Sequence, residues 1–177
     1  MEILRIGDKL ISWSRIQYKL ERILEMRSRG ASQQEVAEKM GIDRTFISRL
    51  EGLGEIRKGK NVGIVGFPVM NKDEIMKVLD DYGITRRLLL SEKERIHFIQ
   101  NKSGLELFNQ LMELIGEFRN LDTVVVMASD KRIELIQDLL DNQVVPLVIG
   151  MSPITEDIYV KPELLRTVLD ALAGEEE

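Results

Sequence analysis

Cysteine is missing from all 177 residues of the chain. Disulfide bonds, thiolate zinc sites and cysteine nucleophiles are therefore excluded together. Long hydrophobic runs are missing as well. The longest, at 62–70 and 144–151, contain glycine and proline and fall far short of the ~20 apolar residues of a membrane-spanning helix. The first residues also lack the basic-then-apolar layout of a secretory signal. We expect a cytoplasmic protein with no membrane partner.

Histidine is nearly absent too, and the single one, His97, is flanked by apolar residues. One histidine makes no metal-ligand cluster, and no nucleophile forms a recognisable pair with it. Neither Gly-x-Gly-x-x-Gly nor Gly-Lys-Ser/Thr occurs, so both standard nucleotide-phosphate loops are missing. We therefore expect no metal, no cofactor and no enzymatic activity.

Positive charge is scarce in one part of the chain only. The whole chain has 25 Lys and Arg against 30 Asp and Glu, a net charge of −5. Residues 1–60 have 13 basic and 9 acidic side chains, a net charge of +4, whereas residues 61–177 have 12 and 21, a net charge of −9. This asymmetry predicts two domains, 1–60 and 61–177, joined by the polar segment 55–61.

The basic part has the pattern of three short helices, at 14–29, 33–40 and 43–52. Ser32 and Glu35 form a capping-box pair, Gly41 can take the positive φ of a tight turn, and Asp43 can cap the third helix. Apolar residues recur at helical spacing and predict a shared core. Residues 1–13 also place Ile3, Ile6 and Leu10 at the spacing of a helical stripe.

The third helix leaves polar side chains at i, i+1, i+4 and i+5 on its outer face, where they could enter a DNA major groove. These residues are Arg44, Thr45, Ser48 and Arg49.

The runs Ser-Gln-Gln-Glu-Val-Ala-Glu-Lys-Met-Gly and Ile-Ser-Arg-Leu-Glu resemble the helix-turn-helix of phage-repressor-like (Xre family) transcription regulators, over residues 14–54. The resemblance implies that Gln33 contacts phosphate and braces a recognition side chain. It implies a sequence-specific regulator bound to a double-stranded DNA operator. The family's two further helices have no room before the next predicted strand, so residues 1–13 or the second domain would form the homodimer.

The acidic part alternates short β-branched runs, at 62–69, 84–90, 123–128 and 144–149, with helices at 72–82, 105–119, 131–141 and after Pro162. Continuously apolar strands between helices predict a four-stranded parallel sheet of Rossmann-like or flavodoxin-like type, used for dimerisation or effector sensing.

Ligands of such sheets bind beyond the carboxyl ends of the strands. There, Ser129 can cap a helix, and Lys131 and Arg132 add positive charge at its amino end, which suits a small anionic effector. The loop after the first strand is less suited to phosphate, because Asn71 can cap the next helix while Asp73 and Glu74 occupy its positive end. The candidate ligand residues are Gly66, Phe67, Pro68, Ser129, Lys131, Arg132 and Ser152.

Two alternatives differ in function class. One is an enzyme or a protein-binding switch of Rossmann-like fold that carries a helix-turn-helix appendage. The other, a phosphoacceptor receiver domain, needs an acidic pair after the first strand, where this chain has Gly-Phe-Pro-Val instead.

Overall fold

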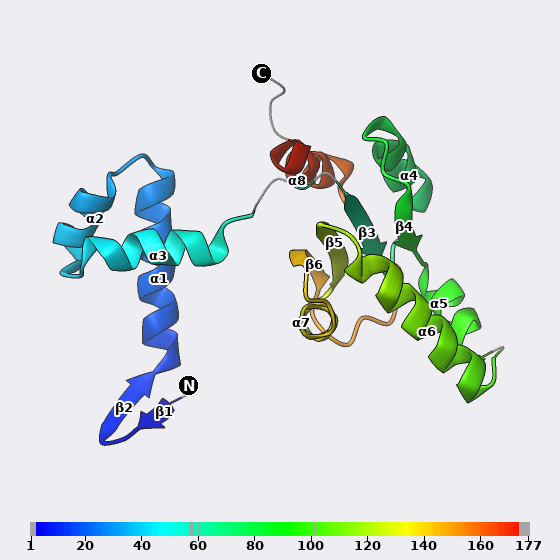
Figure 1. Cartoon of the computed structure of the whole chain (residues 1–177), viewed down its shortest axis with the longest axis horizontal. Coiled ribbons are helices and arrows are strands. Elements are labelled where there is room, and N and C mark those ends of the chain that lie inside the picture. The colour runs from blue at the N-terminus through cyan, green and yellow to red at the C-terminus, as the bar shows by residue number, and fades with distance from the viewer. Residues whose placement is uncertain (1–2, 57–58, 60, 101, 174–177) are drawn as a thin grey trace. The chain divides into compact units, whose positions relative to one another are not determined.

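The computed structural model describes residues 3–56, 59, 61–100 and 102–173, which divide into two compact units, Met1–Glu55 and Ile56–Glu177 (Figure 1). All three basic residues of the expected linker lie outside the described residues, as does the acidic carboxyl end: Arg57, Lys58 and Lys60. None of the helices that the structure describes is both long and apolar enough to cross a membrane.

The first unit begins with a β-hairpin, so the helical stripe expected at residues 1–13 is wrong. Strands β1 (Ile3–Ile6) and β2 (Lys9–Ser12) pair antiparallel, with Ile3 opposite Ser12. The two-residue turn between them places Gly7 at φ +58°, a conformation that glycine adopts without strain. The turn at Gly7 therefore determines the fold of this segment more strongly than the three-residue spacing of Ile3 and Ile6.

Three helices follow the hairpin: α1 (Trp13–Ser28), α2 (Gln33–Met40) and α3 (Arg44–Gly54). The capping box of Ser32 and Glu35 is confirmed, as is the left-handed Gly41 at φ +63° that turns the chain from α2 into α3. α3 extends two residues past its predicted end at 52. Apolar side chains from all three helices form one small core, in which the fully buried residues are Ile23, Val36, Ala37 and Ile47.

The second unit contains a four-stranded sheet, and the predicted parallel sheet is confirmed. Its strands are β3 (Val62–Gly66), β4 (Arg86–Leu89), β5 (Thr123–Ser129) and β6 (Gln143–Gly150). They pair in the order β4-β3-β5-β6, all parallel. From β3 the chain runs to β4, which pairs with one edge of β3, and then to β5, which pairs with the other edge. The connections that follow β3 and β5 therefore run in opposite directions along the sheet, and the point of reversal lies between these two strands.

Helices cover both faces of this sheet (Figure 1). α4 (Lys72–Asp81) and α8 (Pro162–Ala173) pack on one face, and α6 (Gly104–Arg119) and α7 (Asp130–Leu139) on the other. Every residue of β5 is buried, which explains its continuous run of apolar residues.

Two local expectations for this unit fail. The sequence pattern predicted no helix at α5 (Glu92–Gln100), which follows β4 and has no fully buried residue. Asn71 does not cap α4, because its side-chain amide bonds both the N–H and the C=O of Val160, at 2.9 and 2.8 Å. The side chain therefore fastens the segment before α8 to the start of α4.

Candidate functional site

The outer face of α3 in the helical unit is the first candidate surface. Ile47 points inward and is completely buried, and Leu50 packs against the same core. The four polar residues expected on the outside are all exposed. We call this set the α3 face: Arg44, Thr45, Ser48 and Arg49. The helix thus separates an apolar side that holds the unit together from a polar side that faces solvent.

The start of α3 is fixed by Asp43, as predicted. One carboxylate oxygen of Asp43 accepts the backbone N–H of Thr45 at 2.6 Å and also the Thr45 hydroxyl. A carboxylate is favourable at a helix amino terminus because it satisfies a free amide and opposes the positive end of the helix dipole. Thr45 is therefore held in place by its own helix cap.

A chain of polar contacts connects the α3 face to the rest of the helical unit. The side chain of Gln33 lies 3.5 Å from Arg44, measured from Oε1 to Nε, and donates from Nε2 to Glu51 Oε2 at 2.7 Å. Glu51 also accepts from Arg27, whose guanidinium donates in addition to the Ala31 carbonyl. The hydrogen bond from Arg27, then that from Gln33, lowers the pKa of the Glu51 carboxyl. Gln33 and Arg44 are thus brought together, with Glu51 and Arg27 behind them.

Glu51 and Arg27 were not predicted to be parts of this arrangement. Arg27 lies on α1 and Glu51 on α3, 24 residues apart in the chain. Their meeting depends on the way in which the three helices pack, and no local spacing indicates it. Arg49, by contrast, has no contact with this chain of side chains among the hydrogen bonds of the described residues.

The second candidate surface lies at the carboxyl ends of the parallel strands in the other unit. Arg132, in the first turn of α7 after β5, places its guanidinium 5.4 Å from the ring centre of Phe67, which follows β3. Burial, and next the nearby Arg95, lowers the pKa of Arg132, while Glu92 acts in the opposite direction. Glu92 and Arg95 begin α5, after β4. Side chains that follow three neighbouring strands thus meet at one edge of the sheet.

Arg95 and Glu92 form a two-point ion pair at this edge. Arg95 Nε donates to one carboxylate oxygen of Glu92 at 2.8 Å, and Nη2 donates to the other at 2.5 Å. This pairing lowers the pKa of Glu92 and raises that of Arg95. Neither residue was predicted, because no helix was expected here. A capping box, Ser91 with Glu94, would have revealed the helix start.

Ser129 does not cap α7, contrary to expectation. It is still paired with Gly150 as the last residue of β5, and it is 0 % exposed. Its hydroxyl has no hydrogen-bond partner among the described residues, and the same is true of the buried Nη1 of Arg132. Asp130 instead accepts the N–H of Ser152 at 2.7 Å.

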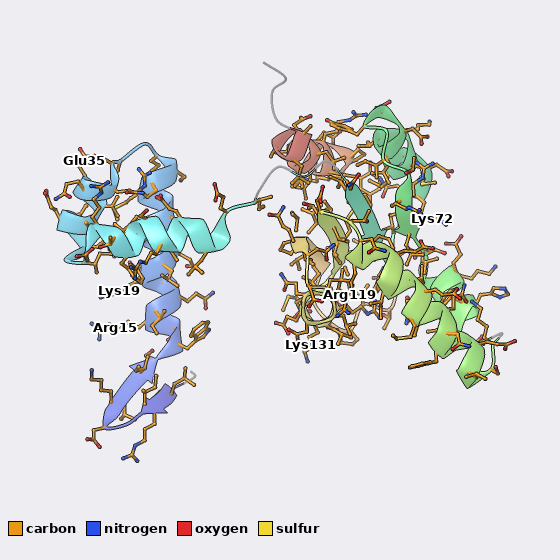
Figure 2. All side chains as sticks on the ribbon, viewed as in Figure 1. Arg15, Lys19, Glu35, Lys72, Arg119 and Lys131 are labelled. Atoms are coloured by element: carbon orange, nitrogen blue, oxygen red, sulfur yellow. The ribbon has the colours of Figure 1, made fainter. Side chains whose placement is uncertain are left out.

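The remaining candidate ligand residues differ in their accessibility. Lys131 is exposed at the start of α7 (Figure 2). Gly66 and Pro68 are buried, and a side chain at Gly66 would come within 2.8 Å of both Leu89 and Met127. The carbonyls of Gly66 and Pro68 accept backbone N–H groups from Leu90 and Ile158. These two residues therefore belong to the packed interior of the sheet edge.

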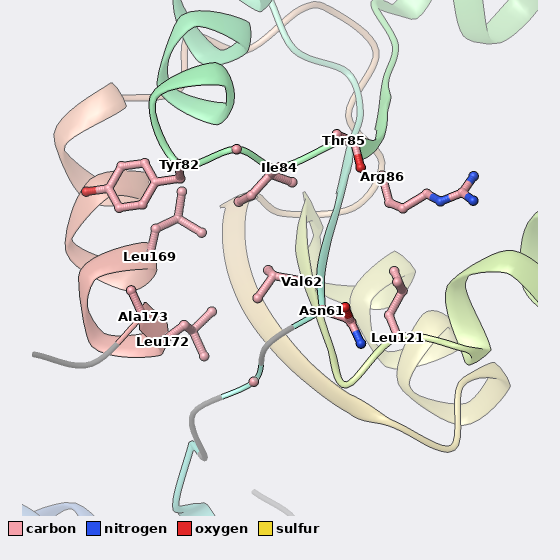
Figure 3. Close-up of a pocket in the computed structure, with 12 residues that line it drawn as sticks. Asn61, Val62, Tyr82, Ile84, Thr85, Arg86, Leu121, Leu169, Leu172 and Ala173 are labelled. Atoms are coloured by element: carbon pink, nitrogen blue, oxygen red, sulfur yellow. The ribbon is translucent and has the colours of Figure 1, made fainter. Parts of the chain in front are cut away.

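A cavity of about 590 Å³ lies at the opposite edge, beside the amino ends of β3 and β4. Figure 3 shows that Val62, Ile84 and Leu169 line it with apolar side chains. Tyr82, also in its wall, donates its hydroxyl to Asp170, and this contact raises the pKa of the phenol. The cavity does not include any of the predicted ligand residues.

No protein-family model matches the chain, and comparison with curated proteins and with solved structures finds no match either.

Proposed function

We propose that the protein is a sequence-specific DNA-binding transcription regulator, in which α2 and α3 form the helix-turn-helix and the α3 face enters the major groove. The observation that carries the proposal is the exposed set Arg44, Thr45, Ser48 and Arg49 on a helix that buries Ile47 and packs Leu50 against the core of its unit. The contact of Gln33 with Arg44 supports it, because a braced guanidinium loses less side-chain freedom on binding.

The residue types on this face suit base and phosphate contacts. An arginine can donate two parallel hydrogen bonds to a guanine edge, which discriminates against other bases by about 1–3 kcal/mol. Serine and threonine hydroxyls can bond bases or phosphates. Gln33, at the first position of α2, stands where a helix amino terminus favours a phosphate.

We further propose that the protein acts as a homodimer on a palindromic operator, with the hairpin as the contact between copies. One short helix reads few base pairs, and two copies that read half-sites about 34 Å apart read twice as many. The hairpin suits this role because a two-stranded ribbon is marginal by itself and both of its strands have free edges. Its large apolar side chains are exposed, among them Ile3, Leu4, Ile6 and Leu10.

The second unit is proposed to be a small flavodoxin-like domain that senses an effector. Numbered within that unit, its strand order is 2-1-3-4, which matches the order of flavodoxin-like sheets in their first four strands. The divergence of connections between β3 and β5 supports a ligand site at the carboxyl edge.

Selection from a random double-stranded DNA library with the full chain tests the DNA proposal. We expect a recurring palindromic sequence, and an affinity that falls steeply as salt rises. Arg44→Ala and Arg49→Ala should each reduce the preference for the selected sequence by roughly tenfold or more, with the fold unchanged by circular dichroism. Lys77→Ala, which removes an exposed charge on α4, is the matched control and should retain full preference.

Failure to enrich any sequence, together with the lack of salt-dependent DNA affinity, would overturn the DNA proposal. An arginine variant that stays fully selective would remove that residue from the proposed base contacts.

Sedimentation velocity tests the dimer. The double variant Leu4→Ser with Ile6→Ser should sediment as a monomer, because it removes apolar area from one face of the hairpin. Leu135→Ser, which changes an exposed leucine on α7, should leave the dimer intact. A monomeric wild-type protein, or a dimer unaffected by the hairpin variant, would contradict the assignment.

A further inference from the structure

The carboxyl edge of the sheet holds two polar groups that the fold buries without pairing. The hydroxyl of Ser129 has no partner among the described residues, although this residue is 0 % exposed. Nη1 of Arg132 is also buried without a partner in the part of the chain that the structure describes. Folded proteins bond nearly all such groups, because an unpaired buried donor is costly. The two groups lie three residues apart in the chain, and a ligand that bonds both would remove this cost.

The two groups belong to one helix terminus. Ser129 is the residue immediately before α7, and Arg132 is the third residue of the helix. In that relation a serine usually accepts the third amide of the helix, but here its side chain caps none of the amides. The amino end of α7 thus offers uncapped N–H groups, a hydroxyl and a guanidinium in one turn. Such a terminus favours an anion.

Cations and carboxylates both lie around this terminus. Arg95 lies close enough to Arg132 to disfavour its charge, whereas Glu92, which bonds Arg95, favours it. Asp130 adds a second carboxylate and Lys131 a third cation, although Asp130 is already engaged by the N–H of Ser152. Asp157 is a third carboxylate here, since it accepts the N–H of Glu92 at 2.6 Å, so an incoming anion would compete with carboxylates for the three cations.

We propose that the carboxyl edge binds a small molecule through a phosphate-type oxyanion, held by the Ser129 hydroxyl, the Arg132 guanidinium and the first amides of α7. Phe67 stabilises the position of the Arg132 guanidinium, since the cation lies over its ring. Arg95 is the second cation of the site and exchanges part of its bond with Glu92 for the incoming anion. The site is independent of the α3 face, so its test needs no DNA.

Calorimetric titration and thermal unfolding of the full chain measure the binding. The probes are inorganic phosphate and glycerol 3-phosphate, each compared with chloride at equal ionic strength. We expect either phosphate probe to bind with saturation and to raise the unfolding temperature beyond the chloride value. Tighter binding of the monoester assigns the site to an organic phosphate, and tighter binding of the free ion assigns it to inorganic phosphate.

Three variants test the residues. Arg132→Gln should weaken phosphate binding roughly tenfold or more, because it removes a charged donor. Ser129→Ala should also weaken phosphate binding but leave the ligand-free protein at least as stable as wild type, since the hydroxyl lost is unpaired there. If the hydroxyl had a purely structural role, Ser129→Ala would instead lower the stability of the ligand-free protein and leave phosphate binding unchanged. Lys77→Gln, on the opposite face of the sheet, is the charge-matched control and should bind like wild type.

The proposal is overturned if neither phosphate probe binds more tightly than chloride or raises the unfolding temperature above the value in chloride. It is also overturned if the Arg132→Gln and Ser129→Ala variants both bind phosphate as wild type does. DNA binding is measured separately, so a loss of one proposal leaves the other standing.

Discussion

The two units of the chain differ in how they bury apolar residues. The helical unit has four fully buried apolar side chains in its core, while the sheet unit packs apolar clusters on both faces of β3 and β5. The helical unit also leaves large apolar residues exposed on its hairpin. In a small core each buried residue contributes a large share of the free energy of unfolding, whereas in a large core that free energy is distributed over many residues. The difference implies that the two units unfold separately and respond unequally to the same substitution.

The largest contrast should come from matched core substitutions. Ile47→Ala and Ile64→Ala each truncate an isoleucine that is 0 % exposed, one in each unit, and each should cost about 3 kcal/mol. Ile47→Ala should unfold the helical unit, because little other core remains there. The fluorescence of Trp13, the single tryptophan, reports on that unit during urea denaturation. Loss of the Trp13 transition in the Ile64→Ala protein would show that the units fold as one.

A smaller effect is expected at the turn that joins α2 to α3. Gly41→Ala should destabilise the helical unit by about 1 kcal/mol, because φ is +63° and an alanine there is strained. The space around Gly41 is open, so the cost should come from the backbone alone. The Trp13 denaturation curve should shift, and the far-ultraviolet signal of the sheet unit should not. Equal shifts in both would contradict independent units.

An effect of pH should distinguish the sheet unit. The hydrogen bond from Lys72, then the N–H of Ser91, lowers the pKa of Glu94 to about 2. A depressed carboxyl pKa stabilises the fold above the ordinary value near 4.5, and this contribution is lost as the pH falls toward 2. Because half of this side chain is exposed, we expect about 1 kcal/mol. Glu94→Gln should flatten the dependence of sheet-unit stability on pH between 4.5 and 2, as measured by circular dichroism; an unchanged profile would reject this role.

The smallest effect should have the opposite sign. Gly52 lies inside α3 with open space around its Cα and without a positive φ. Gly52→Ala should therefore raise the free energy of unfolding of the helical unit by roughly 0.5–1 kcal/mol, since alanine is the better helix former. Urea denaturation followed through Trp13 checks this. A decrease would mean that the end of α3 needs the freedom of glycine.

Local chemistry was enough to predict much of the helical unit and the sheet. The bonds of Ser32 and Asp43, and the turn at Gly41, each depend on neighbours within a few residues, and all three are present. The hairpin was not predicted because Ile3 and Ile6 also have helical spacing. Only the turn at Gly7 distinguishes a hairpin from a helix in this segment. α5 was missed because its apolar residues form no clear stripe.

The site predictions show the same limit. Ser129 was expected to cap α7, but it remains in the ladder of β5, where its pairing with Gly150 decides its position. Arg95 reaches Arg132 only because the ends of β4, β3 and β5 lie next to one another. Glu51 meets Gln33 only because α3 packs across α2. Contacts of this kind depend on strand order and helix packing, and a single sequence does not encode them in its spacing.

Helix α5 is fastened to the sheet unit mainly by charge. None of its nine residues is fully buried, and its anchors are polar: Glu94 with Lys72, and the N–H of Glu92 with Asp157 at 2.6 Å. Ionic anchors weaken as salt rises, whereas apolar burial does not. The amides of α5 should therefore exchange with deuterium through local opening that salt accelerates, while those of β5 exchange only when the whole sheet opens. The local stability of α5 should therefore depend on the salt concentration, whereas that of the sheet should not.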